Sequence, residues 1–423
     1  MLTLTPEFTG ILDELEKDKN HLVITGKAGT GKSTLLNLFR TTTKLNAVFL
    51  APTGIAALRI KGQTIHSFFR FPPRLITPMD IQRHFLVGRL VKKLQVLVID
   101  EMSMLRADVL DAIDASLKLH RRNDHPFGGV KLVLFGDMYQ LPPVVGGTEE
   151  AYLFNQKYAS PYFFDSDVWG KLTGIQYIQL NQVFRQKDAA FIHLLDQIRN
   201  NELEAEDLAV LNNLVDLESR PGNGYIYLSP RNHTVDRINK IELDQIDKPV
   251  EVFQGELTGD FSLSNVPANL VLSLKIGSQV MIIRNDVDMA YVNGTIGVIT
   301  NIGEKIEVTD SITSEVYKIE KAKWEMIRYI IDPEDKDKIS TKTIGTFEQY
   351  PLKLAWAMTI HKSQGQTFDR VILDMEGGAF EHGQTYVALS RCTGLEGLKL
   401  KRPLRSRDFI LDERIFAFLH NFR

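Results

Sequence analysis

The glycine-rich segment GKAGTGKS (26–33) restricts the possible folds of this chain more than any other part of its sequence. It follows a short apolar run, HLVIT (21–25), and opens a stretch with helical periodicity that extends to Arg40. In such a loop, glycines let backbone N–H groups converge on phosphate oxygens, Lys32 adds a positive charge, and the Ser33 hydroxyl can ligate Mg²⁺. Because this loop requires a strand before it and a helix after it, the segment predicts an α/β fold that binds a nucleotide.

Further apolar runs lack the strict alternation of half-exposed strands, and helical patterns separate them. They are NAVFLA (46–51), VLVIDE (96–101), KLVLFGD (131–137), YIYLS (225–229) and RVILDM (370–375). Runs rich in Val, Ile and Leu are typical of parallel strands that are buried on both faces. Alternation of these runs with helices predicts two doubly covered parallel sheets.

The pattern changes between about 270 and 345, where short alternating runs such as GTIGVIT and EKIEVT are separated by Asn-Gly and Thr-Asp turn signals. This spacing predicts a small antiparallel insertion. We therefore expect a first α/β domain at 1–184, a second at 185–269 and 346–423, and a β insertion at 270–345.

Composition excludes several classes of protein. The 423 residues are 43% hydrophobic and 24% charged, which is ordinary for a globular chain. The single cysteine, Cys392, cannot form an internal disulfide, and no apolar run approaches the length of a membrane span. The first twenty residues carry five acids against two lysines, which does not resemble a targeting peptide. We expect an intracellular protein, in the cytoplasm or nucleoid of a bacterium or a phage host.

The charge is unevenly distributed. The formal net charge is −3, but Arg59 to Lys93 holds eight basic residues and one acid, and Gly383 to Arg407 holds six and one. Such runs are often only solvated faces. Two basic segments in an acidic chain could also form a local groove for a polyanion.

Acidic and amide side chains follow two of the apolar runs. Asp100 and Glu101 end VLVID, where one carboxylate could hold a metal and the other could accept a proton from attacking water. Gln140 in GDMYQLPP (136–143) also follows a strand, and could orient the water or contact the γ-phosphate. Taken alone, Gln140 is more typical of a turn residue.

Two arginines in the second half stand in polar strings at strand–helix junctions, Arg185 in LNQVFRQ (180–186) and Arg391 in YVALSRC (386–392). An arginine supplied across a cleft can stabilise charge on a transferring phosphoryl group. A GTPase is disfavoured, because the nearest match to its base-reading NKxD string, NKIE (239–242), lies in an unsuitable place.

Taken together, seven motifs in order resemble those of superfamily-one DNA helicases. They are GKAGTGKS, APTGIAALRIKGQTIHSFF (51–69), VLVIDEMSML (96–105), RRNDHPFGGVKLVLFGDMYQLPPV (121–144), LNQVFRQKD (180–188), LKLAWAMTIHKSQGQTFDRV (352–371) and YVALSRCTGLEGL (386–398). The string DASLKLHRRNDHPFGG resembles the signature of the petite-integration-frequency helicases, which translocate 5′→3′. The family usually has a glutamine near the N-terminus that reads adenine, whereas LTPEF (4–8) has Phe8 there.

The resemblance implies two RecA-like domains, a small Src-homology-like β-barrel as the insertion, and a wedge insertion at about 67–90 of the first domain. It also implies ATP and Mg²⁺ as cofactors. Catalysis would depend on Lys32, Glu101, Gln140, Arg185 and Arg391, and the metal would be held by Ser33 and Asp100. The nucleotide would be bound by Gly26, Ala28, Gly29, Thr30, Gly31, Lys32, Ser33, Thr34, Gln364 and Gly365.

Two Thr-Ile-His strings, at 64–66 and 359–361, suggest where DNA is held, because hydroxyls, imidazoles and lysines bind phosphates and phenylalanines can stack on bases. The histidines and phenylalanines could instead belong to the core. The expected DNA-binding residues are Pro52, Thr53, Gly54, His66, Ser67, Phe68, Thr359, His361 and Lys362.

The resulting hypothesis is an ATP-dependent 5′→3′ helicase or translocase. Its partners would be single-stranded DNA, 5′-tailed duplexes or structured DNA, and other replication or repair proteins, without a membrane. Two alternatives remain: a nucleotide-regulated clamp that does not unwind, and the motor subunit of a nuclease complex.

Overall fold

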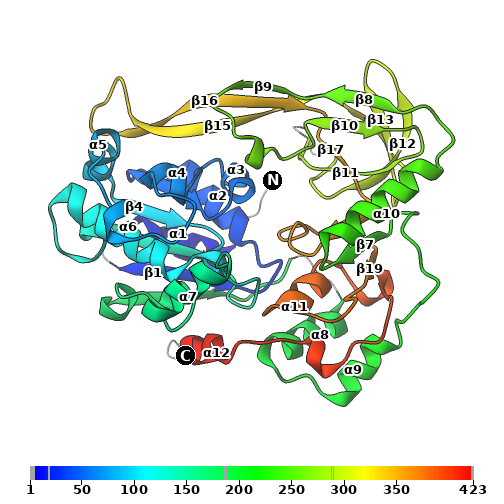
Figure 1. Cartoon of the computed structure of the whole chain (residues 1–423), viewed down its shortest axis with the longest axis horizontal. Coiled ribbons are helices and arrows are strands. Elements are labelled where there is room, and N and C mark those ends of the chain that lie inside the picture. Colours follow the sequence, from blue (N-terminus) through cyan, green and yellow to red (C-terminus); the bar gives the residue numbers. More distant parts are fainter. Residues whose placement is uncertain are drawn as a thin grey trace.

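The computed structural model describes residues 5–17, 20–184, 186, 188–286, 288 and 290–420. Figure 1 shows two α/β bodies side by side, with an extended β region above them that reaches from the second body over the first. Among the described residues, no helix is both long and apolar enough to cross a bilayer. The predicted α/β class with parallel sheets is confirmed.

The first domain is a six-stranded parallel sheet in the order β3-β2-β4-β5-β1-β6. Its strands are β1 (His21–Gly26), β2 (Ala47–Ala51), β3 (Gln63–Thr64), β4 (Val96–Ile99), β5 (Lys131–Gly136) and β6 (Ile175–Leu180). Its helices are α1 (Pro6–Glu16), α2 (Lys32–Thr42), α3 (Gly54–Arg59), α4 (Ile65–Phe69), α5 (Phe85–Lys93), α6 (Ala107–Arg121) and α7 (Thr148–Lys157).

Both faces of this sheet are covered, which explains why its strands read as continuous apolar runs. Leu22 and Ile24 of β1 pack into one core with α1 and α2, whereas Val23 packs into the core on the opposite face with α6. Successive side chains of a strand point to opposite faces, so both sets must be apolar when helices lie on both sides.

The second domain is a four-stranded parallel sheet in the order β18-β7-β19-β20. Its strands are β7 (Ile226–Ser229), β18 (Ala357–Thr359), β19 (Val371–Leu373) and β20 (Leu398–Leu400), so the sheet draws on chain segments before and after the insertion. Its helices are α8 (Ala189–Asn200), α9 (Ala205–Asn212), α10 (Asn232–Gln245) and α11 (Gln384–Leu389). The last helix, α12 (Glu413–His420), returns to the first domain, where Phe418 stacks on Phe164.

The insertion is antiparallel, as predicted from its turn signals. It holds a five-stranded sheet (β14-β13-β12-β11-β17), a three-stranded sheet (β15-β16-β9) and the pair β10-β8. The strands are β8 (Glu251–Gln254), β9 (Glu256–Gly259), β10 (Val271–Leu274), β11 (Gln279–Ile282), β12 (Ile296–Ile302), β13 (Ile306–Asp310), β14 (Val316–Ile319), β15 (Ala322–Ile331), β16 (Ile339–Gln349) and β17 (Leu352–Leu354). Antiparallel pairing therefore extends beyond 270–345 on both sides. Closure of these sheets into a barrel, and the domain bounds themselves, stay predictions.

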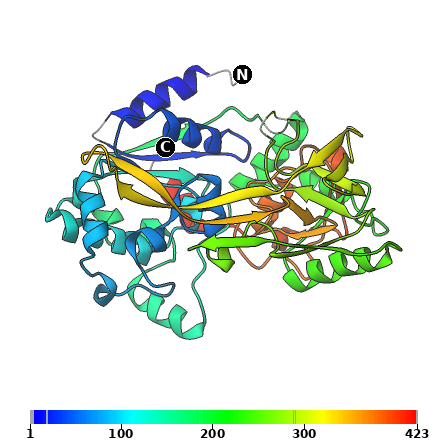
Figure 2. The ribbon, with the colours of Figure 1, turned by 90° about the horizontal axis from the view of Figure 1, so that it is seen from above.

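The long β15–β16 hairpin reaches over the first domain, where it contacts α5 (Figures 1 and 2). Because β3 is only two residues long, it pairs with Leu50 and Ala51 but leaves the backbone of Phe49 without a strand partner on that edge. The Tyr329 hydroxyl of the hairpin takes this place: it accepts from Phe49 N–H (3.0 Å) and donates to Phe49 C=O (3.3 Å). At the hairpin tip, Asn46 bonds to Asp337 C=O (2.7 Å) and Ile339 N–H (3.1 Å).

Removal of the Tyr329 hydroxyl should therefore loosen the hairpin from the first domain. We expect Tyr329→Phe to lower the free energy of unfolding by about 1–3 kcal/mol, because the buried Phe49 N–H loses its partner. Chemical denaturation measures this change. Tyr317→Phe is the matched control, since its hydroxyl donates to an exposed carboxylate, Glu315. Equal effects of the two substitutions would contradict a docking role.

Candidate active site

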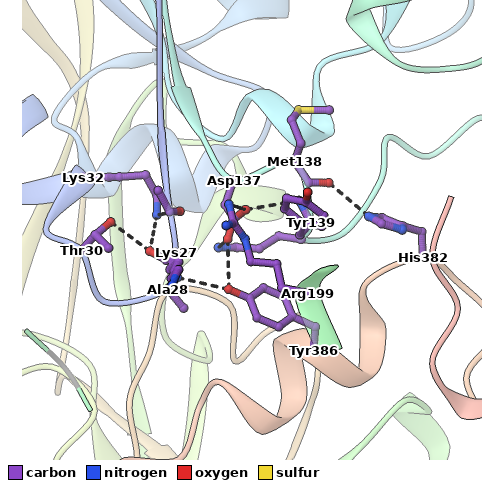
Figure 3. Close-up of polar contacts among 12 residues, drawn as sticks. Lys27, Ala28, Thr30, Lys32, Asp137, Met138, Tyr139, Arg199, His382 and Tyr386 are labelled. Carbon is purple, nitrogen blue, oxygen red and sulfur yellow. Dashed lines mark hydrogen bonds and ion pairs between the residues drawn. The ribbon is translucent and has the colours of Figure 1, made fainter. Parts of the chain in front are cut away.

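The phosphate loop has the conformation that its glycines predict. β1 ends at Gly26 and α2 begins at Lys32, with Gly29 and Gly31 between them in the left-handed region (φ 82° and 81°). The Lys32 ammonium lies over the loop and donates to the carbonyls of Gly26 (2.6 Å) and Lys27 (2.8 Å), and the Thr30 hydroxyl donates to the same Lys27 carbonyl (Figure 3). The loop backbone and Lys32 therefore form a cradle for phosphates at the start of α2, beside Ser33 and Thr34.

The two acids after β4 differ in environment. Asp100 is 6% exposed, and burial raises the pKa of its carboxyl well above the usual range. The neighbouring Glu101 carboxylate adds to this rise, while Arg59 and Lys32 oppose it. Glu101 adopts a left-handed backbone (φ 53°), which is uncommon outside glycine and is found where a site imposes it.

The donor set fits Mg²⁺. Within the described parts of the chain, no group of three His, Cys, Asp or Glu side chains converges on one point. A buried carboxylate at Asp100 and the hydroxyl of Ser33 are hard oxygen donors, and Mg²⁺ characteristically takes one or two protein ligands together with phosphate oxygens and water.

Residues of both domains meet at Glu101. Gln364, which follows β18, donates from Nε2 to Gln140 Oε1 (3.1 Å) and to Glu101 Oε2 (3.4 Å). Arg59 at the end of α3 lies 3.4 Å from the other Glu101 oxygen. Gly365 is left-handed (φ 77°), and a Cβ there would come within 2.3 Å of the Arg59 guanidinium. The structure thus brings Glu101, Gln140, Gln364 and Gly365 together.

Arg59 is a functional candidate that sequence reasoning missed. Its string APTGIAALR was singled out, but only Pro52, Thr53 and Gly54 received a role. The available signal was a lone arginine at the end of a short helix that follows a buried strand, and this signal does not say which carboxylate it would meet.

A second interdomain cluster lies beside the phosphate loop (Figure 3). Asp137, which follows β5, accepts from the Tyr386 hydroxyl of α11 (3.3 Å) and lies 3.4 Å from Arg199 of α8. The Tyr386 hydroxyl in turn accepts from the loop amide of Ala28 (3.3 Å). Lys27 of the same loop pairs with Asp196 of α8 at 2.6 Å. The second domain therefore contacts the phosphate loop directly. Nothing in the sequence around Arg199 or Tyr386 indicates this contact.

Loss of Arg199 should destabilise the domain interface strongly. Its side chain is buried, the Asp137 carboxylate is fully buried, and the guanidinium also lies over the Tyr139 ring at 4.3 Å. We expect Arg199→Leu to lower the free energy of unfolding by about 3–5 kcal/mol, because an unpaired carboxylate remains buried. Chemical denaturation should show partial recovery in the double variant with Asp137→Asn.

The control is Lys305→Met, which breaks an exposed pair with Glu320 and should change stability by less than about 1 kcal/mol. A similar small effect of Arg199→Leu would contradict a buried interface pair.

Arg391 lies beneath the Gln364 segment and is 1% exposed. Its guanidinium donates to the carbonyls of Val387 (2.8 Å) and Gln366 (3.3 Å) and to the Ser390 hydroxyl (2.7 Å). In this arrangement, Arg391 is held by groups of its own domain, so contact with a γ-phosphate would require it to exchange some of these bonds. Arg185 lies outside the described residues.

The expected DNA-binding residues differ in how exposed they are. Lys362 is exposed, and His361 is half-buried with Nε2 3.1 Å from Glu381. Ser67 and Pro52 are accessible, while His66 is partly buried, which lowers the pKa of its imidazole, as does the charge of Arg106. Thr53 caps α3 by accepting from Ala56 N–H.

Three of these residues are buried or partly buried in this arrangement. Phe68 is 4% exposed and packs edge-on against Phe69 and Tyr329, so its ring has no free face for a base. Thr359 is buried at the end of β18. Gly54 is half-buried and faces Asn265, whose Oδ1 would lie 2.0 Å from a Cβ there. Contacts with residues distant in the sequence bury Phe68 and Thr359 in this arrangement.

A phosphate loop on one RecA-like domain, facing polar residues of a second, defines a two-domain nucleotide-binding motor core of the superfamily-one type. The chain belongs to the PIF1-like helicase family, whose profile matches residues 4–208, and the profile of the Pif1 2B domain matches residues 260–302.

Individual relatives agree with this assignment. The chain is 33% identical over 413 residues to the ATP-dependent DNA helicase PIF1 of Danio rerio, a match that covers 94% of this chain and 61% of the relative. It is 31% identical over 435 residues to the ATP-dependent DNA helicase Pif1 of Bdellovibrio bacteriovorus, with 100% and 92% covered. The chain thus spans about three fifths of the length of the Danio rerio relative and most of the bacterial one.

Comparison with Bacteroides sp Pif1 identifies the arrangement of the domains. The complex of that protein with ADP-AlF4 superposes with a TM-score of 0.93 at 35% identity, covering 100% of this chain and 97% of that one, and its unliganded structure with 0.91. The structure bound to single-stranded DNA superposes with only 0.70 at the same identity and coverage. The present structure therefore has the arrangement shared by the ADP-AlF4 complex and the unliganded protein, and differs from the DNA-bound one.

Proposed function

We propose that this chain is an ATP-dependent DNA helicase that translocates 5′→3′ on single-stranded DNA and unwinds tailed duplexes or structured DNA. The observation that carries the proposal is the meeting of Glu101, Gln140 and Gln364 from two RecA-like domains beside a phosphate loop. Family membership supports it, since the matched relatives are named as ATP-dependent DNA helicases. Family likeness also supports G-quadruplexes and RNA–DNA hybrids as substrates, repair or replication proteins as partners, and a cytoplasmic or nucleoid location in a bacterium.

In the proposed reaction, the phosphate loop amides and Lys32 bind the β- and γ-phosphates of ATP. Bound Mg²⁺ would neutralise phosphate charge, held by Ser33 and Asp100. Glu101 accepts the proton of the attacking water, and Arg59 and Gln364 fix the orientation of its carboxylate. Gln140, which accepts a hydrogen bond from Gln364, would contact the γ-phosphate.

Hydrolysis drives movement only if the nucleotide favours one arrangement of the domains over another, since a ligand shifts an equilibrium by its differential affinity. The second domain touches the phosphate loop at Ala28 and Lys27, and it meets the catalytic glutamate through Gln364. A nucleotide in the loop would therefore be bordered by contacts of both domains. We infer that alternating grip by the His66 and His361 regions moves the strand.

The arrangement of the insertion supports a coupled DNA step. In the present structure the β15–β16 hairpin is docked on the first domain, and the DNA-bound Bacteroides structure differs from it in overall arrangement. We infer that strand binding is accompanied by movement of the insertion.

Non-specific contacts to the phosphate backbone of DNA would suit an enzyme that moves along any sequence.

The test is ATP hydrolysis with and without single-stranded DNA, followed by unwinding of duplexes that carry either a 5′ or a 3′ tail. Stimulation by DNA and unwinding from the 5′ tail alone are expected. Stimulation without unwinding would favour a translocase that needs a partner, and hydrolysis indifferent to DNA would overturn the proposal.

A further inference from the structure

His382 is a buried histidine at the boundary of the two domains, outside the phosphate loop and the catalytic network. It precedes α11 and is 5% exposed. Its Nε2 lies 3.1 Å from the Met138 carbonyl oxygen, as Figure 3 shows, and its Nδ1 lies 2.9 Å from the Asp412 backbone nitrogen. Because a carbonyl only accepts and an amide N–H only donates, these partners select the neutral imidazole with its proton on Nε2.

The surroundings of His382 favour this neutral form. Burial lowers the pKa of the imidazole, and the Met138 carbonyl and the carboxylates of Asp412 and Asp137 oppose this shift without cancelling it. Both carboxylates are themselves paired, Asp137 with Arg199 and Asp412 with Arg414. Each ring nitrogen of His382 is therefore committed to one backbone partner, and the two partners belong to different segments of the chain.

The first of these segments is the turn at 137–140 in the first domain, and the second domain rests directly on it. Gly383 has a left-handed backbone (φ 69°), and a Cβ there would lie 2.3 Å from the Tyr139 carbonyl oxygen and 3.0 Å from that of Gln140. Within the turn, Gln140 N–H donates to the Asp137 carbonyl (3.0 Å). The start of α11 thus contacts the backbone of the turn that carries Gln140.

The second segment is the chain that leads into α12. Next to the bond from Asp412 to His382, the Gly383 N–H donates to the Ile410 carbonyl (3.0 Å), so this segment is attached to the start of α11 at two points. Its other end reaches the first domain, where the Phe416 ring meets the Tyr139 ring edge-on with centroids 5.7 Å apart. The turn at 137–140 is therefore held between α11 and α12, and His382 bonds to both sides of the junction.

Gln140 connects this turn to the catalytic network. Its side chain is buried, and its Oε1 accepts from Gln364 Nε2 (3.1 Å), which also reaches Glu101. Catalysis is sensitive to such placement, since a displacement of about 1 Å caused by a distant substitution can cost about 10²-fold in rate. His382 bonds to the backbone two residues before Gln140, so it bears on the position of Gln140 without touching its side chain.

Resting on the proposed function of nucleotide hydrolysis, we infer that His382 is a positioning residue for Gln140. It holds the Met138 carbonyl, and with it the turn at 137–140, in the place where Gln140 meets Gln364. His382 makes no contact with the phosphate loop in this structure, so it acts on the turnover of bound ATP and leaves nucleotide binding nearly unchanged.

The experiment measures kcat and KM for ATP on the full chain with saturating single-stranded DNA and Mg²⁺, together with the affinity for a fluorescent ADP analogue and thermal unfolding. His382→Leu removes both bonds and should lower kcat by about tenfold, with KM and ADP affinity within about twofold of the parent chain. His233→Leu, at an exposed histidine of the same domain, is the control and should match the parent. An unchanged kcat in His382→Leu, or an equal loss of kcat and ADP affinity, would overturn the inference.

Two conservative variants separate positioning of the turn from general support of the fold. His382→Gln can still donate to the Met138 carbonyl and should restore kcat to within about threefold of the parent. His382→Asn has a shorter side chain that keeps an acceptor for Asp412 N–H, so its kcat should stay low. Equal kcat in these two variants would overturn the inference even if His382→Leu does not fold.

A double-mutant cycle tests whether His382 acts through Gln140. In a Gln140→Ala background, His382→Gln and His382→Asn should differ in kcat by less than about twofold, since the group that they position is absent. The same difference between them in both backgrounds would assign His382 a role independent of Gln140 and overturn the inference alone. A parent chain without ATP hydrolysis would overturn the proposed function and this inference with it.

Discussion

Glu101→Gln should abolish most ATP turnover and leave nucleotide binding nearly intact. The substitution keeps the size of the side chain and one oxygen for Gln364 and Arg59, but it removes the group that accepts a proton from water. Loss of a positioned general base typically lowers the rate by about 10²- to 10⁴-fold. Binding should change little, because the phosphate contacts come from the loop and Lys32. Steady-state hydrolysis in the presence of single-stranded DNA, with titration of a fluorescent ADP analogue, measures both quantities.

Glu149→Gln is the matched control, since it makes the same change at an exposed position at the start of α7. It should be indistinguishable from the parent chain. Retention of more than about a tenth of the turnover in Glu101→Gln would move the role of base to another group.

Arg391→Ala should reduce turnover far more than nucleotide affinity. An arginine that stabilises charge on the transferring phosphoryl group is worth about 10³- to 10⁵-fold in rate. In the present structure Arg391 donates to Val387, Gln366 and Ser390, so it is close to the Gln364 segment but held by its own domain. A finger role therefore requires that binding of nucleotide and DNA releases part of this network.

Because the Arg391 side chain is fully buried, its removal also has a structural cost, which must be separated from catalysis. Thermal unfolding and ADP affinity should be recorded beside turnover, and Arg391→Lys compared with Arg391→Ala. Lysine keeps the charge but cannot reproduce the planar fork of guanidinium donors, so turnover should remain low while stability partly recovers. Equal losses of turnover and of ADP affinity would instead identify Arg391 as a structural residue.

The amino-acid sequence determined the features that depend on neighbouring residues. The phosphate loop, the acids after β4 and the buried strands are all local patterns, and the structure has them where they were predicted. Val109, Leu110, Ile113 and Leu117 recur at helical spacing in the sequence, and all four are buried on α6. Such features are readable because backbone conformation and strand burial leave a periodic trace in the chain itself.

Tertiary structure alone decided which distant residues meet. Arg59 reaches Glu101 across 42 positions, Asp137 meets Tyr386 across 249, and Tyr329 completes the edge of a sheet 280 positions away. Tertiary packing also buried Phe68, although its neighbours in the sequence, His66 and Ser67, are residue types that can bind phosphates. A single arginine, tyrosine or phenylalanine has no periodicity, and its partner is fixed by how two sheets and a hairpin pack together. For that reason the chemistry of the site could be predicted from local motifs, whereas the contacts that couple its two domains could not.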